Sequence, residues 1–294
     1  MFNPRPTISV VIPTLNRAQA IADLVDDLLK QQHPVFTIIV VDQTTAINTA
    51  LSSLAANEPR LKIIRPDVVG TCHARNAGVA AAPGEIIVFC DDDCRLPNTD
   101  FLAGHAKNYT DEKVGGVAGR IIDKNETLNR EQSGPVCRVT ATGKVYGNAS
   151  SGVRQDVNAP RGANMSFRRA VIVQVGGFDE QFRGNAMREE TDFSLRVVKA
   201  GWQIVYDPEI PVTHLGLSGG SRSSDRLRWY RDFFFNESYF FLKHFSSILL
   251  PLLFLRKLRA IIACWIWYGH GKFSWFIAPW RSFAEARRLV RIKT

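Results

Sequence analysis

The chain has 294 residues, of which 45% are hydrophobic and 22% charged, so its composition is that of a folded globular protein rather than a disordered chain. Its length suits one large domain or two ordinary ones. No uncharged apolar run reaches the roughly 18 residues of a membrane-spanning helix, and the polar, proline-containing start does not resemble a signal peptide. An odd number of cysteines without zinc-site spacing predicts free thiols at Cys72, Cys90, Cys94, Cys137 and Cys264.

The net charge of +9 is concentrated at one end of the chain. Residues 215–294 contain 14 Lys or Arg but only 4 Asp or Glu, together with 18 of the 30 aromatic residues, whereas residues 1–214 are nearly neutral. Basic aromatic segments are typical of membrane-surface helices and of nucleic-acid surfaces. The aromatic clusters at 229–230, 233–235 and 240–241 and the apolar run at 248–255 are too hydrophobic for solvated stacking platforms. We therefore predict membrane-surface helices and no nucleic acid, with a helical subdomain or an oligomer interface as the alternative.

Residues 8–90 alternate between short apolar runs and amphipathic segments. Strands are predicted at 8–12, 37–41, 61–64 and 85–90, and helices at 46–57 and 72–82. A further helix is predicted between the first two strands, where Ile21, Leu24, Val25, Leu28 and Leu29 share one face. This alternation predicts an α/β fold with a mainly parallel sheet flanked by helices.

The second half of the body has weaker signals. Residues 123–161 are rich in Gly, Ser, Asn and Arg, which predicts loops and short strands, with a flap as one interpretation. We expect helices at 168–175 and 189–200, the latter ended by Gly201, and a strand at 202–206 that leads to His214.

Polar residues follow three of the predicted strands. Thr14, Asp42 and the run Asp91, Asp92 and Asp93 all stand at carboxyl ends, where parallel sheets bind their ligands. Three adjacent carboxylates repel one another, and a hard divalent cation compensates them. Asp91 and Asp93 would share one face of an extended segment, leaving Asp92 for another contact such as a ribose hydroxyl. The alternative is a solvated acidic turn.

Other titratable residues are ambiguous from the sequence alone. The helix dipole by itself would explain Glu189, Glu190 and Asp192 in the first turn of a helix, and Asp192 also forms an ordinary i, i+4 pair with Arg196. His214 alone is more often a core residue than a ligand. We assign Cys90 and Cys94 to packing, because soft thiolates and hard carboxylates suit different metals.

Seven short segments occur in the order of a known family. They are ISVVIPTLNR (8–17), IVVD (39–42), ARNAG (74–78), GEIIVFCDDD (84–93), GANMSFRR (162–169), GGFDE (176–180) and EETDFSLR (189–196). In this order the chain resembles the family 2 glycosyltransferases of GT-A fold, a Rossmann-like architecture. The resemblance spans residues 8 to about 216, so we predict a GT-A catalytic domain at 1–217 and a helical, membrane-associating extension at 218–294.

The resemblance implies a metal-dependent, inverting glycosyltransferase of the hexosyltransferase type. By matching position, Mg²⁺ or Mn²⁺ would be held by Asp93, Asp91 and His214. The family usually has Glu-Asp where this chain has Glu189 and Glu190, so Glu190 is the expected base and Glu189 or Asp192 an alternative. The nucleotide-sugar would contact Pro13, Thr14, Asn16, Arg17, Asp42, Arg75, Asp91, Asp92, Gly162, Ala163 and Asn164.

The same resemblance suggests the partners and two rival functions. We expect a UDP-sugar donor and a glycan or lipid-linked acceptor, in polysaccharide or glycolipid synthesis. The enzyme would be peripheral or monotopic at the cytoplasmic face of the cell membrane, on an anionic surface. The rivals are a non-catalytic, membrane-bound nucleotide-sugar-binding protein on the same fold and an Asp-x-Asp phosphotransferase of the haloacid-dehalogenase type. The second fits poorly, because Arg95 occupies the position where that pattern needs Thr or Val.

Overall fold

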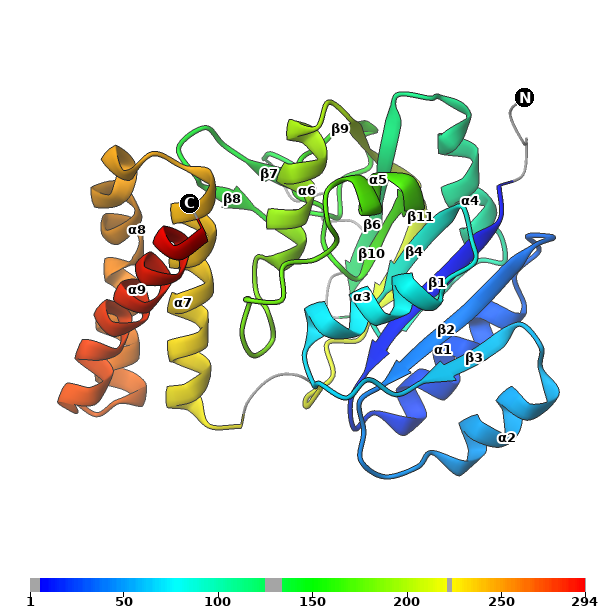
Figure 1. The fold of residues 1–294 in the computed structure, drawn as a ribbon, viewed down its shortest axis with the longest axis horizontal. Coiled ribbons are helices and arrows are strands. Elements are labelled where there is room, and N and C mark those ends of the chain that lie inside the picture. Colours follow the sequence, from blue (N-terminus) through cyan, green and yellow to red (C-terminus); the bar gives the residue numbers. More distant parts are fainter. Residues whose placement is uncertain (1–5, 125–133, 221–223, 294) are drawn as a thin grey trace.

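A computed structural model describes residues 6–124, 134–220 and 224–293 (Figure 1). Its strands are β1 (Ile8–Thr14), β2 (Phe36–Asp42), β3 (Leu61–Ile64), β4 (Ile86–Cys90), β5 (Cys94–Arg95), β6 (Val114–Asp123), β7 (Arg138–Val139), β8 (Val145–Tyr146), β9 (Gln155–Asp156), β10 (Asn164–Arg168) and β11 (Gln203–His214). Its α-helices are α1 (Ala18–Leu29), α2 (Thr49–Asn57), α3 (Thr71–Ala81), α4 (Phe101–Lys107), α5 (Arg169–Gln174), α6 (Glu189–Lys199), α7 (Arg226–His244), α8 (Leu250–Ala263) and α9 (Phe273–Lys293). Shorter helical turns are η1 (Asn108–Thr110), η2 (Ser247–Leu249) and the π-helical η3 (Cys264–Tyr268).

One large sheet forms the centre of the molecule. Its strand order is β3-β2-β1-β4-β10-β6-β11-β5, with β9 added beside β11. Strands β3, β2, β1 and β4 are parallel to one another, and β6 and β11 are parallel to each other. Strand β10 lies between β4 and β6 and is antiparallel to both. The predicted α/β class with a mainly parallel sheet is therefore confirmed. Because Thr14 pairs with Asp42, the polar ends of β1 and β2 lie side by side.

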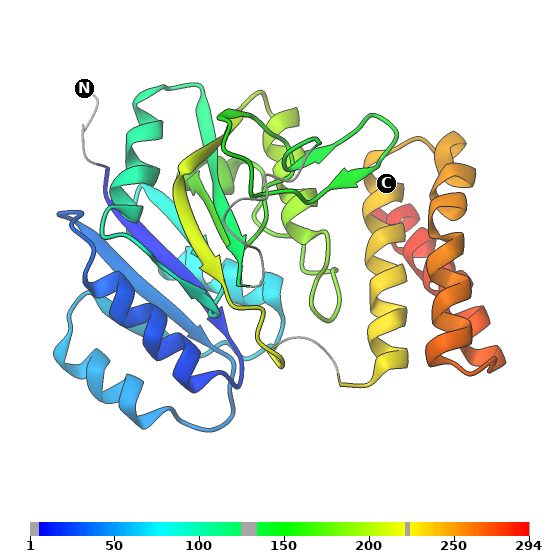
Figure 2. The same cartoon turned by 180° about the vertical axis from the view of Figure 1, so that it is seen from behind.

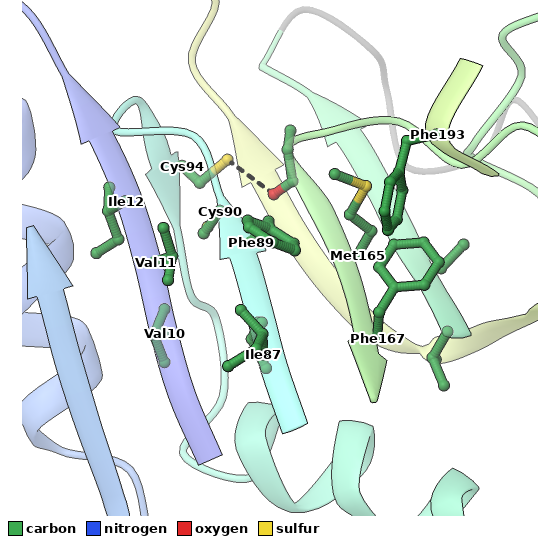
Figure 3. Packing of buried hydrophobic residues seen from close by; sticks show 14 of the residues in the cluster. Val10, Val11, Ile12, Ile87, Phe89, Cys90, Cys94, Met165, Phe167 and Phe193 are labelled. Atoms are coloured by element: carbon green, nitrogen blue, oxygen red, sulfur yellow. Dashed lines mark hydrogen bonds between the residues drawn. The ribbon is translucent and has the colours of Figure 1, made fainter. Parts of the chain in front are cut away.

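The central strands are buried on both faces. Helices α1 and α2 cover one face, and α3, α5 and α6 cover the other (Figures 1 and 2). Side chains of β1, β4 and β10 and Phe193 of α6 belong to one hydrophobic core, in which the rings of Phe167 and Phe193 lie 4.8 Å apart (Figure 3). Cys94 packs there as expected, its thiol 3.6 Å from the carbonyl oxygen of Ala163. All five cysteines are free thiols, as predicted.

Most predicted elements are present, with shifted ends. The helix expected at 46–57 begins at Thr49, because the side chain of Asn48 accepts a hydrogen bond from the backbone N–H of Leu51 and caps it. The strand expected at 202–206 continues to His214 across a register shift between Asp207 and Pro211. Region 123–161 contains the short strands β7, β8 and β9, and its residues 125–133 lie outside the described part of the chain.

The C-terminal helices form a bundle beside the sheet (Figure 2). Helix α7 packs against the body, and its Phe235, Tyr239 and Phe240 belong to the same hydrophobic core as the central strands. The sequence predicts a membrane surface for the aromatic clusters at 233–235 and 240–241. This prediction is wrong for Phe234, Phe235, Phe240 and Phe241, because their side chains are buried inside the protein. Within the described residues, no helix has the length and apolar character needed to cross a bilayer.

Candidate functional site

A cleft of about 310 Å³ opens beyond the carboxyl ends of the central strands. Eleven residues singled out from the sequence line it, and they come from β1, α3, the segment after β4, the approach to β10, α6 and β11. They are Pro13, Thr14, Arg17, Arg75, Asp91, Asp92, Asp93, Gly162, Glu189, Glu190 and His214. The fold thus gathers residues up to 200 positions apart into one polar site.

Asp91, Asp93 and His214 form a cluster in which one ligand atom from each lies within 4.8 Å of the others. Antiparallel pairing of β11 with β5, which opposes His214 to Cys94, brings the imidazole to the aspartates. The Oδ1 atom of Asp123 lies 2.7 Å from Nδ1 of His214 and fixes the ring, so that Nε2 faces Asp93 at 3.5 Å. The two carboxylates of Asp91 and Asp93, with an imidazole oriented by a third carboxylate, are a donor set that suits Mn²⁺ or Mg²⁺.

Asp92 is not part of that cluster, although Arg17 contacts both Asp92 and Asp93, the latter at 3.2 Å. The Asp92 carboxylate accepts a hydrogen bond of 2.7 Å from the Thr14 hydroxyl and another of 2.7 Å from the Arg17 guanidinium. Burial nevertheless raises the pKa of Asp92 above its ordinary value. Arg17 also donates to the carbonyl oxygen of Leu217 at 2.6 Å, so it ties β1 to the segment after β11.

Arg75 is a buried cation on the floor of the cleft. Its guanidinium is paired with Glu189 and lies 3.4 Å from Asp91, and it sits 5.4 Å from the ring centre of Phe178. Gly162 lies directly against it, since a Cβ at residue 162 would come within 2.3 Å of Nη2 of Arg75. Glu189 therefore neutralises and positions Arg75, and Gly162 leaves room for it.

Glu190 is a partly exposed carboxylate of the cleft. Burial raises its pKa above the ordinary glutamate value, against the opposing effect of Arg75. A carboxylate with a raised pKa is a stronger proton acceptor, which suits a general base. Among the three candidates for this role, Glu190 alone faces the cleft without a direct ion pair.

Asp192 does not line the cleft, which corrects its place among the candidate bases. It is fully buried on the far side of α6, where Arg196 lies at 3.0 Å and Lys243 and His244 of α7 each lie at 2.7 Å. Although burial opposes ionisation, these partners lower the pKa of Asp192. Asp192 is a structural link between α6 and α7.

The turn before α6 has an unusual backbone. Ala186 and Arg188 both adopt positive φ angles, +51° and +82°, which non-glycine residues rarely do outside functional sites. Helix α7 holds this turn, because Glu237 accepts a 2.7 Å hydrogen bond from Arg188, and Asn236 accepts one of 2.9 Å from the backbone N–H of Arg183. The position of Glu190 therefore depends on α7.

Sequence comparison now identifies the family. Residues 9–172, more than half of the chain, match the model of glycosyl transferase family 2. The chain belongs to glycosyl transferase family 2. It is 28% identical over 227 residues to the pre-mycofactocin glycosyltransferase of Mycobacterium tuberculosis, covering 72% of this chain and 45% of that protein. It is 34% identical over 145 residues to a putative colanic acid biosynthesis glycosyl transferase, WcaA of Escherichia coli, covering 45% of this chain and 51% of that one. The chain thus spans about half the length of these curated relatives.

Solved structures share the fold of this family 2 chain. The mannosyltransferase PcManGT from Pyrobaculum calidifontis, in complex with GDP-Man and Mn²⁺, superposes with a TM-score of 0.61 and 20% identity, covering 97% of this chain and 76% of that one. TarS 1-349 of S. aureus superposes with a TM-score of 0.61 and 18% identity, covering 95% and 80%. These likenesses confirm the GT-A fold.

Four residues that the family resemblance assigned to the donor lie elsewhere. Asn164 is fully buried, where its amide donates to the carbonyl oxygens of Arg120 and Ile210 and its Oδ1 contacts His105 at 3.1 Å. Ala163 is also buried and does not line the cleft. Asn16 and Asp42 line an adjoining cavity of about 280 Å³ on the α1 side. We correct the prediction that Asn164 lines the donor sugar, because the strand alternation of β10 turns its side chain into the core.

Nine cleft residues were not singled out from the sequence of this family member. Leu15 and Gln43 follow β1 and β2, and Thr71 begins α3. Asn185 and Met187 belong to the turn before α6. The stretch after His214 lines one side of the cleft with Gly216, Leu217, Gly219 and Gly220. Their place after a strand could have identified some of them, since Gln43 and residues 216–220 follow the carboxyl ends of β2 and β11, where such sheets bind ligands.

Proposed function

We propose that this protein is a metal-dependent, inverting glycosyltransferase that moves a sugar from a nucleoside-diphosphate donor to an acceptor hydroxyl. The observation that carries the proposal is that the Asp91–Asp93–His214 cluster and the carboxylate of Glu190 line the same cleft. One site can thus hold a diphosphate through a cation and present a base to an alcohol. Membership of the family and the GDP-Man and Mn²⁺ in the structurally similar mannosyltransferase support it.

The described residues divide the work of donor binding. Asp91, Asp93 and His214 would hold the divalent cation, which when bound supplies a Lewis acid for the negative charge of the departing diphosphate. Thr14, Arg17 and Gln43 line the side of the cleft next to β1 and β2, where the nucleoside would lie. Arg75 forms ion pairs with Asp91 and Glu189 and so positions both carboxylates.

Glu190 would act on the acceptor. A hydroxyl is a weak nucleophile at neutral pH, so a carboxylate within hydrogen-bond reach takes its proton as the oxygen bonds to C1 of the sugar. The bond from C1 to the diphosphate oxygen breaks in the same displacement, and the electron pair leaves with the nucleoside diphosphate. A single displacement inverts the configuration at C1. The cleft contains one base that is not directly paired, Glu190, which fits one displacement rather than two.

The finer substrate classes are part of the proposal. We infer a UDP-sugar donor and a glycan or lipid-linked acceptor in polysaccharide or glycolipid synthesis, at the cytoplasmic face of the membrane. In support, one relative bears the name of a colanic acid biosynthesis glycosyl transferase and another that of an O-antigen biosynthesis protein, RfbC of Myxococcus xanthus.

A donor panel tests the proposal. Purified protein is incubated with UDP- and GDP-sugars and Mg²⁺, Mn²⁺ or a chelator, and release of nucleoside diphosphate is measured as the sugar passes to an added glycan hydroxyl or to water. We expect metal-dependent release with one donor class, and we expect Asp93→Asn to lower it by about a hundredfold or more, since electrostatic stabilisation of the leaving group would be lost. Asp123→Asn serves as a milder comparison, because Asp123 contacts only the far nitrogen of His214 in the cluster. Tight donor binding without any release would favour the non-catalytic binding protein, and activity in the chelator would contradict the metal site.

A further inference from the structure

Helices α8 and α9 of the C-terminal bundle each carry a row of exposed apolar side chains. On α8 and η3, Leu255, Leu258, Ile262 and Ile266 recur at intervals of three and four residues and are all exposed, Leu255 by 67%. Such spacing places them on one side of a helix. The other side of α8 turns inward, where Leu253 and Ile261 are buried.

Helix α9 carries a second row of exposed apolar side chains. Its exposed side carries Phe273, Phe276 and Trp280, again three and four residues apart, with Phe273 exposed by 71%. The two helices are joined through their aromatic rings, since Phe254 stacks on Trp280 at 4.9 Å and Trp265 lies 5.5 Å from Phe276. We call these seven side chains, Leu255, Leu258, Ile262, Ile266, Phe273, Phe276 and Trp280, the outer face.

The segment that carries the outer face is basic. Residues 246–294 contain nine Lys or Arg and one acidic residue, Glu285. Glu285 is paired with Arg183 at 2.6 Å. Arg287, Arg288 and Arg291 border Phe283 and Ile292 on the last turns of α9. A second copy of this surface would bring like charges together, whereas an anionic lipid surface would neutralise them and take up the rings.

We propose that the outer face docks this protein onto an anionic lipid bilayer, with α8 and α9 lying on the membrane rather than crossing it. This placement narrows the one expected from the sequence, because most aromatic residues of α7 are inside the protein and the contact belongs to α8, η3 and α9. The turn between α8 and α9, with Ile266 and Phe273 at its two sides, lies at the same end of the molecule as the carboxyl ends of β1 and β2 (Figures 1 and 2).

Vesicle binding tests the proposal without any donor or acceptor, so its outcome does not depend on the proposed transfer reaction. Full-length protein is mixed with vesicles of phosphatidylcholine alone or of phosphatidylcholine and phosphatidylglycerol in equal parts, and bound protein is measured by flotation. We expect binding to the anionic vesicles. The double variant Ile266→Gln, Phe273→Gln should lower it by about tenfold or more, because two large apolar side chains no longer enter the lipid. Its matched control is Val35→Gln, Val173→Gln, two exposed apolar residues of the body, which should bind as the parent does.

A second pair of variants tests the charge. Arg287→Gln, Arg288→Gln should weaken binding to anionic vesicles by roughly thirtyfold, since each cation at such a surface contributes about 1 kcal/mol. Lys62→Gln, Arg169→Gln removes two exposed cations of the body and should leave binding unchanged. Melting curves establish that the variants fold.

Three results would overturn the proposal. The first is a parent protein that does not float with anionic vesicles. The second is an outer-face variant that binds as well as its control. The third is a parent dimer in sedimentation that the Ile266→Gln, Phe273→Gln variant abolishes, since a second copy would then be the occupant.

Discussion

Glu190 illustrates how burial sets the chemistry of one residue. Its neighbour Glu189 has the same side chain, yet Glu189 is buried against Arg75 while Glu190 opens to the cleft. Two adjacent glutamates therefore have different surroundings, and we propose a structural role for Glu189 and a reactive one for Glu190.

The role of Glu190 predicts a specific pH dependence. Glu190→Gln should leave donor binding intact and lower transfer by about a hundredfold or more, because an amide cannot accept the proton. In the parent, transfer requires the carboxylate. Activity should thus be full above the folded-state pKa, which lies above the ordinary value of 4.5, and fall as the pH drops through it. The measurement is transfer rate against pH; near-normal turnover by the amide variant would reassign the base.

Gly162 is required by the space that Arg75 occupies. Gly162→Ala should destabilise the protein by about 1–3 kcal/mol and weaken nucleotide binding, because the new methyl group would overlap the guanidinium and push it from Glu189. Denaturant unfolding and calorimetric titration with nucleotide measure the two effects. Gly147→Ala is the control, since no atom lies within 4 Å of its Cβ position. Equal behaviour of the two variants would mean that Arg75 relaxes freely.

At the scale of elements, α7 acts as the support of the α6 N-terminus. Buried Glu237 joins Arg188, directly before the glutamate pair, to Lys257 of α8 at 2.9 Å. Burial opposes its ionisation, but the two cations bring the pKa of Glu237 below its usual value. The strained turn before Glu189 is thus fixed by a charge from another helix.

Removing that charge should loosen the site from a distance. Glu237→Gln should cost about 1–3 kcal/mol of stability, because Arg188 loses its charged partner, and should lower kcat for transfer more than it raises donor KM. Glu285→Gln breaks the exposed pair with Arg183 and should cost less than about 1 kcal/mol. Unfolding curves and steady-state kinetics compare them, and an unchanged kcat in Glu237→Gln would show that the turn holds without α7.

For the molecule as a whole, the sequence predicted what short-range patterns determine. The buried strands β1, β2 and β4 and the polar residues at their ends follow from apolar runs closed by Pro13, Asp42 and Asp91, so the rim of the cleft was found. Asn164 was misplaced because it lies only two residues after Gly162 in the same motif, and the motif does not show which face of β10 the side chain of Asn164 occupies. The aromatic residues of α7 were misplaced because contact with protein and contact with lipid both remove apolar surface from water, and periodicity does not distinguish them.

The division at 217/218 remains a prediction, and the packing of α7 predicts how it can be tested. Deleting residues 218–294 would remove Phe235, Tyr239 and Phe240 from the core, and each lost aromatic contact costs about 3–5 kcal/mol, comparable in sum to the roughly 5–15 kcal/mol stability of a whole domain. We therefore expect the 1–217 fragment to be insoluble or unfolded, and the full chain to melt in a single calorimetric transition. A soluble 1–217 fragment that melts cooperatively near the temperature of the full chain would instead show that the catalytic unit folds independently of the bundle.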